Sequence, residues 1–312
     1  MSGFSADWLA LREPFDHRAR AMAWPALDIG AHAARWRAAQ SHDRVLTVID
    51  LACGSGANLR ALAPRITGPQ RWQLIDHDAA LLAAVPRTLT RWAREHGYRT
   101  TTTPGSRTAL HVEGADFSVE LVTEQADLAL GLDGVGWRQA HLITASALLD
   151  LVSAAWLAAL VSAARERSAA LLFALCVDGR TAWEPVDPGD AEIHRLFSLH
   201  QRRDKGFGGP ALGPAAVPQA CGLLAQAGYT VLQARSDWDL AGPDAPAIVT
   251  AMIEGMAAAA TEQEPEAGAA VRQWKTRRMA LAAVGRLSVG HADIMALPAM
   301  ARGPGPTAGR AP

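Results

Sequence analysis

The sequence has few cysteines. Its three, Cys53, Cys176 and Cys221, lie far apart in the chain, and none belongs to a Cys-x-x-Cys pair. This spacing favours a reduced, cytoplasmic protein without a structural zinc site, and we expect no bound metal. Nothing near Cys53 predicts an activated thiolate, so we interpret it as a small packing residue.

The sequence also lacks an excess of charge of either sign. It has 30 basic and 31 acidic residues, with a formal net charge of -1. No global basic field therefore predicts a nucleic-acid partner or an anionic membrane surface. The short basic clusters at residues 201–203 and 275–278 are typical of solvated helix faces.

Long hydrophobic runs are missing as well. The first residues lack the basic start and apolar centre of a signal peptide. The most hydrophobic region, residues 142–164, is interrupted by Asp150 and does not predict a membrane-spanning helix. We therefore expect a soluble protein. Its 312 residues are 49% apolar, enough to bury a substantial core in one large domain.

From residue 45 onward, short apolar runs alternate with helical patterns. The runs predict strands at residues 45–50, 71–76, 140–146, 170–177, 229–235 and 287–297. Helices are predicted between them at residues 57–63, 79–96, 153–167 and 215–227. Gly114 separates two further alternating runs and predicts a hairpin whose second arm is another parallel strand. The alternation predicts an α/β fold, namely a doubly wound, mostly parallel Rossmann-like sheet with helices on both faces.

Two segments do not follow this alternation. Residues 178–214 are predicted to be largely irregular, and residues 244–284 are predicted to be helical with a break near Glu264. We expect both to be insertions in one domain that spans residues 45–298. Residues 1–44 are expected to form an N-terminal helical cap, and residues 299–312 a disordered tail rich in glycine and proline.

A glycine-rich motif follows the first predicted strand, in the stretch VLTVIDLACGSGANL of residues 45–59. A dinucleotide-binding loop requires a third small residue after Gly54 and Gly56, and that position is Leu59. A phosphate-binding P-loop ends in Gly-Lys-Ser/Thr, which residues 58–60 do not supply. The motif therefore argues against a nicotinamide, flavin or nucleotide triphosphate site.

The stretch DLACGSG at residues 50–56 instead resembles the first motif of the class I, seven-β-strand S-adenosylmethionine-dependent methyltransferases. Glycines without Cβ let the backbone approach the cofactor closely, and an acid at the strand end can hold the ammonium group of its methionine part. The resemblance implies that S-adenosylmethionine is the cofactor. It places the cofactor against Asp50, Ala52, Gly54 and Gly56.

Further motifs continue this resemblance in the same chain order. Asp76 ends the second predicted strand, where the family's acid binds both ribose hydroxyls. The resemblance implies that His77 lies beside the adenine, and that Asp127-Leu128 matches the family's Asp-Leu pair, whose carboxylate meets the adenine amino group. It also implies that the fourth strand leads into the active site, where we expect Thr144 and Ser146 to contact the cofactor and Asp150 to contact the substrate. Taken singly, Asp50 and Asp76 are also explained as strand-end acids, and Glu124 and Asp133 compete with Asp127.

The segment of residues 178–214 is the candidate region for the methyl acceptor. If Asp190 caps a helix, His200 and Asp204 fall near one face, with His200 as general base and Asp204 orienting it. Arg202 and Lys205 could then reach an anionic substrate, and Trp183 could form a wall of the pocket. Alternatively, His200 and Asp204 form an interacting pair on the protein surface without a catalytic role. Trp183 could likewise only hold the loop in place by packing.

The N-terminal segment, residues 8–20, combines apolar residues with several arginines. Helices that precede the first strand often fold over the cofactor in this family, and an arginine there could hold the cofactor carboxylate. A plain amphipathic helix explains the same pattern. The insertion at residues 244–284 could be a lid or a dimer surface, in a monomer or a homodimer.

The acceptor class is narrowed by exclusion. The fourth strand lacks the Asn/Asp-Pro-Pro motif of amino-methylating nucleic-acid enzymes, and no proline precedes Cys176, unlike the catalytic cysteine of cytosine-C5 enzymes. We therefore expect in-line methyl transfer to an oxygen or nitrogen of a small molecule. The alternatives are an RNA or protein methyltransferase, a non-catalytic S-adenosylmethionine-binding protein and, more remotely, a dehydrogenase.

Overall fold

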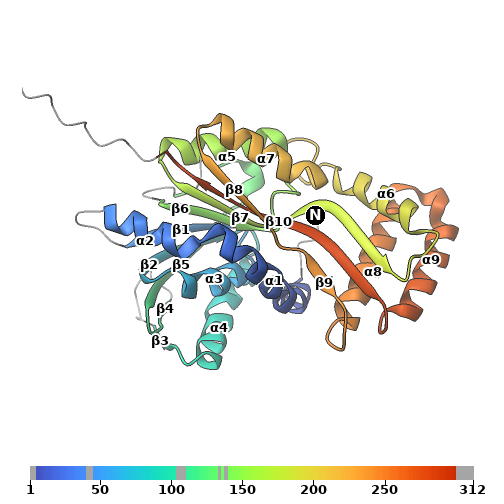
Figure 1. The fold of residues 1–312 in the computed structure, drawn as a ribbon, viewed down its shortest axis with the longest axis horizontal. Coiled ribbons are helices and arrows are strands. Elements are labelled where there is room, and N and C mark those ends of the chain that lie inside the picture. Colours follow the sequence, from blue (N-terminus) through green and yellow to red (C-terminus); the bar gives the residue numbers. More distant parts are fainter. Residues whose placement is uncertain (1–4, 40–44, 103–109, 133–134, 137–139, 300–312) are drawn as a thin grey trace, which may run out of the picture.

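A computed structural model describes residues 5–39, 45–102, 110–132, 135–136 and 140–299 of the chain. The predicted tail at 299–312 and the ends of the predicted cap at 1–44 lie mainly outside these residues. One large sheet runs through the described part, with helices on either side of it (Figure 1).

Five parallel strands form the centre of the sheet, in the order β5-β2-β1-β6-β7. Their bounds are β1 Leu46–Leu51, β2 Gly68–Asp76, β5 Phe117–Gln125, β6 Leu142–Ser146 and β7 Ala170–Glu184. The chain builds outward from β1 to β2 and β5, and then returns to the other side of β1 to place β6. Strand order therefore reverses between β1 and β6, and in sheets of this kind ligands bind in the crevice at the carboxyl ends of those strands.

Antiparallel strands complete the sheet at both edges. β10 (Arg286–Leu297) lies antiparallel between β7 and β8 (Thr230–Arg235), and the short β9 (Trp238–Leu240) pairs with its beginning. At the other edge, β4 (Leu110–Glu113) pairs antiparallel with β5 and with β3 (Arg99–Thr101). The hairpin predicted around Gly114 is confirmed, and its second arm, β5, is parallel to β2.

Helices cover both faces of the sheet, as predicted for a doubly wound fold. One face buries Val48 of β1 together with α2 (Ile29–Ala39), α3 (Ala57–Leu62) and α4 (Ala79–Glu95). The opposite face buries Ile49, the next residue of β1, together with α5 (Ala154–Glu166) and α7 (Ala216–Gln226). Successive side chains of a strand point to opposite faces, so a strand buried on both sides is a continuous apolar run.

Local signals in the sequence position these helices. The Asp78 carboxylate accepts a hydrogen bond from the Ala80 amide at 2.8 Å and begins α4, and the Ser153 hydroxyl accepts from the Trp156 amide at 3.2 Å and begins α5. Each side chain satisfies an amide that the first turn of a helix leaves without an intrahelical partner. Single turns of 3₁₀ helix, among them those at Ala63–Arg65, Leu128–Leu130 and Gly213–Ala215, join longer elements.

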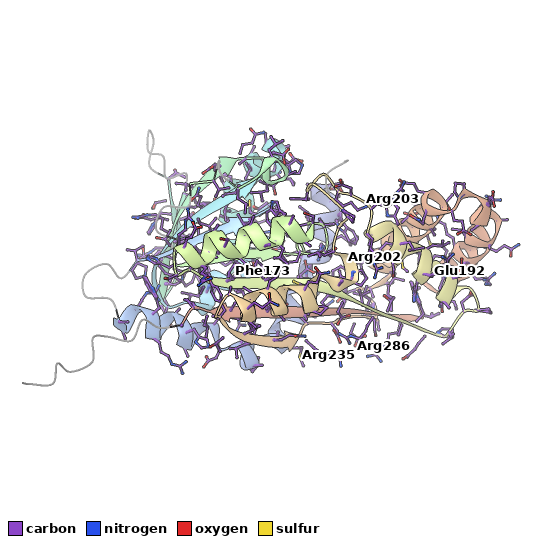
Figure 2. All side chains as sticks on the ribbon, turned by 90° about the horizontal axis from the view of Figure 1, so that it is seen from above. Phe173, Glu192, Arg202, Arg203, Arg235 and Arg286 are labelled. Atoms are coloured by element: carbon purple, nitrogen blue, oxygen red, sulfur yellow. The ribbon has the colours of Figure 1, made fainter. Side chains whose placement is uncertain are left out.

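The prediction of a largely irregular segment after residue 177 is wrong in its first part. β7 continues as a strand to Glu184 and pairs with β10 along this length, because Trp183 alternates with exposed neighbours and faces Leu287 across the pair. The two strands project beyond the central sheet and carry α6 (Asp190–Gln201), α8 (Pro246–Gln263) and α9 (Gly268–Leu281) on one side (Figure 1). We call this part the extension. Arg235 and Arg286 lie on its other side (Figure 2).

Helices of the extension differ in detail from their predictions. α6 begins at Asp190, so that residue is the first of the helix, and the residue in the N-cap position is Gly189. The predicted break near Glu264 is confirmed, since a 3₁₀ turn at Pro265–Ala267 separates α8 from α9. None of the helices in the described residues is both long and apolar enough to cross a bilayer.

A long N-terminal helix, α1 (Ala6–Leu27), connects the two regions. Its beginning packs with the extension through Phe15 and Ala19, and its end packs on the sheet beside α2 through Ala23 and Leu27. Asp28 ends it in a left-handed conformation, with its amide donating to the Trp24 carbonyl at 2.9 Å.

A buried ion pair holds the extension together. Arg278 is 2% exposed, donates two hydrogen bonds to the Asp190 carboxylate and one to the Pro185 carbonyl, and lies over the ring of Trp183. Trp274 donates to the same carboxylate at 2.9 Å.

We expect Arg278→Ala to lower the free energy of unfolding by about 3–5 kcal/mol, because it leaves the Asp190 carboxylate buried without its cation. Urea unfolding followed by circular dichroism would measure this. Arg195→Gln is the matched control, since that arginine pairs with Glu192 and Glu264 at the surface, and its midpoint should match the wild type. An unchanged midpoint for Arg278→Ala would show that the pair does not hold the extension.

Candidate functional site

The loop after β1 turns under the carboxyl edge of the sheet in a strained backbone conformation. Ala52, Gly54 and Gly56 all have positive φ, at 52°, 54° and 83°. A residue other than glycine is uncommon there, so Ala52 is held by its surroundings. The Gly54 amide donates to the Asp76 carboxylate at 2.8 Å, which ties this loop to the end of β2.

Asp50 lies fully buried at the end of β1 and forms a polar link to β6. Its Oδ1 accepts a hydrogen bond from the Asn58 side chain at 2.7 Å, and the same Asn58 nitrogen donates to the Thr144 hydroxyl at 3.1 Å. Thr144 in turn donates to the Leu172 carbonyl at 2.8 Å, which joins β7 to the link. The Oδ2 of Asp50 and the Oδ1 of Asn58 are buried without a hydrogen-bond partner.

Burial raises the pKa of Asp50 from its ordinary value near 3.8 to about 7. The hydrogen bond from Asn58 and the positive charge of Arg20 lower this pKa, but desolvation outweighs them. Asn58 was not among the predicted site residues. The signal available in the sequence was a polar residue in the first turn of a helix whose neighbours are apolar.

Arg20 of α1 is a buried cation beside this link. It is 2% exposed, and its Nε lies 3.8 Å from the Asp293 carboxylate of β10. Asp293 also accepts hydrogen bonds from the Leu175 amide and the Ser236 hydroxyl. The Nε and Nη2 of Arg20 have no hydrogen-bond partner, so two donors of a buried guanidinium are available.

The end of β2 presents a carboxylate whose two oxygens each accept one backbone hydrogen bond. Asp76 accepts from the amides of Gly54 and Asp78, and the ring of His77 lies 3.3 Å from the same carboxylate with 61% of its side chain exposed. Asp127 is exposed and accepts from the Ala129 amide at 2.9 Å, whereas Leu128 is buried. The predicted adenine-side residues therefore follow the ends of β2 and β5, two neighbouring strands.

The end of β6 carries Ser146, which is half-buried, and a short loop to Asp150. Asp150 is buried, and its Oδ1 has no hydrogen-bond partner. Burial raises the pKa of Asp150, while the positive charges of Arg12 and Lys205 lower it. The Asp150 carbonyl accepts from the Gly213 amide at 2.9 Å, so the chain after α6 lies beside this loop.

The predicted pairing of His200 with Asp204 is not present. The Nε2 of His200 lies 3.2 Å from the Glu262 carboxylate of α8, and Asp204 accepts a hydrogen bond from the Gly206 amide at 2.7 Å. Helical spacing placed the two on one face, but α6 ends at Gln201, so Asp204 falls in the turn that follows.

Trp183 does not line the strand ends either. It is 5% exposed, donates from its indole nitrogen to His194 at 3.1 Å and packs edge-on against Trp274. Its place is the core of the extension. Arg202 is exposed at the end of α6 (Figure 2), and Lys205 is half-buried and donates to the His200 carbonyl at 3.3 Å.

α1 closes over the glycine loop. A Cβ added to Gly54 would lie 3.0 Å from the side chain of Leu9. Farther along, Glu13 accepts two hydrogen bonds from Arg60, both at 2.7 Å, and Arg60 also donates to the Ser55 carbonyl at 2.7 Å. One guanidinium thus holds α1, α3 and the loop together.

No protein-family model matches the sequence, and no curated protein matches it. Among solved structures, a candidate methyltransferase from Bacillus halodurans C-125 is 14% identical, with 86% of this chain and 97% of that chain covered at a TM-score of 0.43. An S-adenosylmethionine-dependent methyltransferase from Geobacter sulfurreducens, solved with S-adenosylhomocysteine, is 16% identical (90% and 98% covered, TM-score 0.40). The precorrin-6y C5,15-methyltransferase of Geobacter metallireducens is 11% identical (69% and 78% covered, TM-score 0.35). At TM-scores below 0.5 these likenesses carry no weight for function.

The raised pKa of Asp50 leads to a prediction about pH. Between about pH 4 and pH 7 the folded state keeps a proton on Asp50 that the unfolded chain has released, so the contribution of Asp50 to stability falls as pH rises through this window. We expect the loss to be on the order of a few kcal/mol, at about 1.36 kcal/mol per pH unit. Asp50→Asn, which still accepts from Asn58, should remove this contribution and leave those of Asp150 and Asp293, whose pKa values burial also raises. Urea unfolding of both proteins at several pH values would test it, and parallel stability curves would contradict it.

Proposed function

We propose that this protein is a class I S-adenosylmethionine-dependent methyltransferase that acts on a small molecule. The observation that carries the proposal is the set of buried polar atoms without partners around Asp50, where strand order reverses. Buried polar atoms normally have partners, so such a cluster at the crevice where sheets of this kind bind ligands favours a polar ligand.

The unpaired atoms match the amino-acid end of the cofactor in charge. The free oxygens of Asp50 and Asn58 can accept hydrogen bonds from its ammonium group, and the free donors of Arg20 can bind its carboxylate. Asp50, Asn58 and Arg20 would therefore hold the methionine part. This assigns to Arg20 the role that the sequence suggested for one of several arginines.

The remaining predicted residues suit the adenosine part. Each oxygen of Asp76 accepts one backbone hydrogen bond, and a carboxylate has lone pairs for more, so Asp76 can still bind ribose hydroxyls. The backbone of Ala52, Gly54 and Gly56 would lie under the ligand. We place the adenine near His77, Asp127 and Leu128.

Leu9 has to move from Gly54 for the ligand to enter this edge, since the two are in close contact. We therefore propose that the first turns of α1 open to admit the cofactor and close over it. Closure of this kind also excludes water from the reacting groups.

When bound, the cofactor supplies a methyl group that its sulfonium already activates. The protein then has to align the acceptor and take up a proton if the acceptor carries one. We assign the proton to the free Oδ1 of Asp150, because burial makes this carboxylate more basic than an ordinary one. Thr144 and Ser146, on the same strand end, would line the reacting centre. His200 is not retained as the base.

A small acceptor methylated on oxygen or nitrogen fits the near-neutral charge of the chain, which predicts no nucleic-acid or membrane partner. Lys205, which acts electrostatically on Asp150, could draw in an acceptor with a negative group. We also propose a cytoplasmic monomer or homodimer, with residues 1–44 as a cap on a catalytic domain of residues 45–298.

Two ligands separate the contribution of Asp76, at the adenosine end of the proposed site, from that of Arg20, at the amino-acid end. Asp76→Asn should weaken S-adenosylhomocysteine and 5′-methylthioadenosine alike, tenfold or more, since both contain the ribose. Arg20→Met should weaken S-adenosylhomocysteine only, because 5′-methylthioadenosine lacks the amino-acid part. Calorimetric titration would measure both ligands.

Asp78→Asn is the matched control for Asp76→Asn, since asparagine also caps helices well, and it should bind like the wild type. Thermal melts would show which variants remain folded. If the wild type bound neither ligand, or if folded Asp76→Asn bound both unchanged, the cofactor assignment would be wrong.

The choice of base leads to a separate prediction. With an acceptor found by screening phenols, amines and carboxylic acids for transfer of a radiolabelled methyl group, Asp150→Asn should lower kcat by 10²- to 10⁴-fold, the usual contribution of a general base. Affinity for S-adenosylhomocysteine should be preserved. His200→Gln should keep kcat, and the reverse result would restore His200 as the base.

A further inference from the structure

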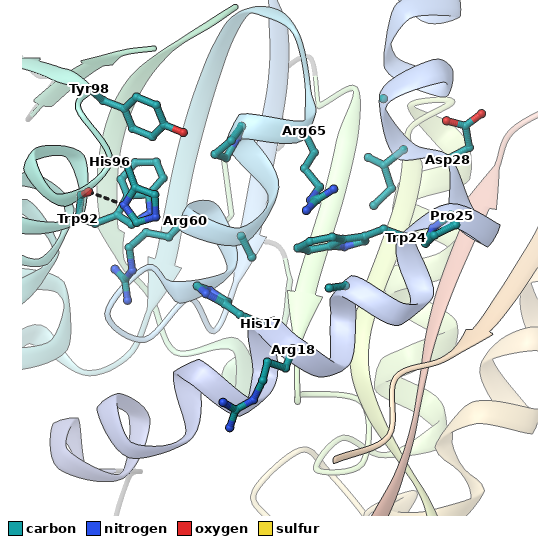
Figure 3. Close-up of a pocket in the computed structure, with 15 residues that line it drawn as sticks. His17, Arg18, Trp24, Pro25, Asp28, Arg60, Arg65, Trp92, His96 and Tyr98 are labelled. Carbon is teal, nitrogen blue, oxygen red and sulfur yellow. Dashed lines mark hydrogen bonds between the residues drawn. The ribbon is translucent and has the colours of Figure 1, made fainter. Parts of the chain in front are cut away.

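A large hollow lies away from the carboxyl edge of the sheet, between α1 and the outer side of α3. Its volume is about 890 Å³, within the range of small-molecule sites. α1 contributes His17, Arg18 and Trp24 to its lining (Figure 3). The opposite side comes from Arg60, Ala61, Pro64 and Arg65, and from the end of α4 with the residues after it.

The hollow is separate from the proposed cofactor site. Leu59 and Leu62 of α3 are buried in the core on the sheet, whereas Arg60, Ala61 and Arg65 line the hollow. The body of α3 therefore stands between the hollow and the sheet. A ligand bound here would be additional to the cofactor.

One end of the hollow is a guanidinium stacked on an indole. The Arg65 guanidinium lies 3.3 Å from the centre of the Trp24 ring, and no acidic side chain of the described residues forms an ion pair with it (Figure 3). Arg18 contributes a second positive charge, with Asp244 at 3.9 Å as an exposed partner. Asp28 is the only acid among the described residues that line the hollow, and Glu13, just outside the lining, pairs with Arg60 and lies 3.7 Å from His17. Arg65 is thus the cation of the lining that has no acidic ion-pair partner among the described residues.

Two buried polar atoms beside this end have no hydrogen-bond partner. They are the indole nitrogen of Trp24 and the Nε2 of His17. An indole N–H can only donate, so Trp24 offers a hydrogen bond to an acceptor. Unpartnered buried polar atoms are rare enough to require an explanation, and a ligand that accepts hydrogen bonds supplies one.

The other end of the hollow is an aromatic wall. Trp92, His96 and Tyr98 contact one another, with ring centres 5.1 to 5.8 Å apart (Figure 3). The His96 ring is fixed by a 2.8 Å hydrogen bond with the Trp92 carbonyl. Such a wall favours a flat, apolar body over a hydrated ion.

We propose that this hollow is a second ligand site, which takes a planar aromatic molecule carrying a carboxylate or phosphate. The acidic group would accept hydrogen bonds from Trp24 and pair with Arg65, and the ring system would extend toward Tyr98. Arginine is suited to this role because it binds carboxylate and phosphate in a bidentate manner while stacking on an aromatic ring.

The test is calorimetric titration of the full chain with 2-naphthoate and with its neutral isostere 2-naphthamide. We expect 2-naphthoate to bind saturably and 2-naphthamide to bind at least tenfold more weakly. Arg65→Gln should weaken 2-naphthoate tenfold or more, and Trp24→Phe, which keeps the ring but removes the donor, severalfold. Arg65 is exposed, so its replacement should leave the fold intact.

Arg71→Gln is the matched control, because that exposed arginine pairs with Glu120 on another part of the surface, and it should bind like the wild type. The proposal is overturned if 2-naphthoate shows no saturable binding, if the amide binds equally well, or if Arg65→Gln has no effect. Titrations with and without S-adenosylhomocysteine separate the two sites. Strict competition, in which the apparent Kd of 2-naphthoate rises without limit as S-adenosylhomocysteine increases, would place 2-naphthoate at the strand ends and overturn the proposal. A failure of S-adenosylhomocysteine to bind would affect the proposed function alone.

Discussion

The burial of the Asp50 carboxyl group is the constraint on which the site depends. Removing a carboxylate from water is unfavourable unless hydrogen bonds or charges compensate for it, and here Asn58 and Arg20 do so only in part. The group therefore holds its proton more strongly than usual, and one of its oxygens has no partner. The polar groups around Asp50 come from several different elements. Asn58 and Thr144 connect β1 to β6 and β7, and Arg20 brings α1 to the same place.

α1 is the element that joins the separate parts of the molecule. Its first turns contact the glycine loop through Leu9, its middle supplies Glu13 to Arg60, and its later turns form one wall of the hollow. Arg20, on the inner side of the same helix, pairs with Asp293 of β10. A movement of α1 that admits a cofactor would therefore also change the walls of the hollow.

The sequence predicted the central fold well because the innermost parallel strands are buried on both faces. β1, β6 and the first part of β7 are short, almost continuous apolar runs, and Asp78 and Ser153 mark the starts of two helices. The second part of β7 was missed because Trp183 is its only buried residue after residue 177, so it lacks the apolar run of the first part. Composition alone made that stretch resemble a loop.

The order of elements and the acids at the ends of β1 and β2 follow from the sequence by itself, because hydrophobic periodicity and strand ends are local properties. Tertiary structure decided which polar groups meet. Arg20 and Asp293 belong to α1 and β10, at opposite ends of the chain, and only the packing of these two elements places Arg20 between Asp293 and Asp50. Packing of α8 against α6 likewise pairs His200 with the Glu262 carboxylate. Trp183 is buried in the core of the extension. Helical spacing predicts on which face of a helix a residue such as His200 lies. Its partner is determined by the element that packs against that face, here α8 with Glu262.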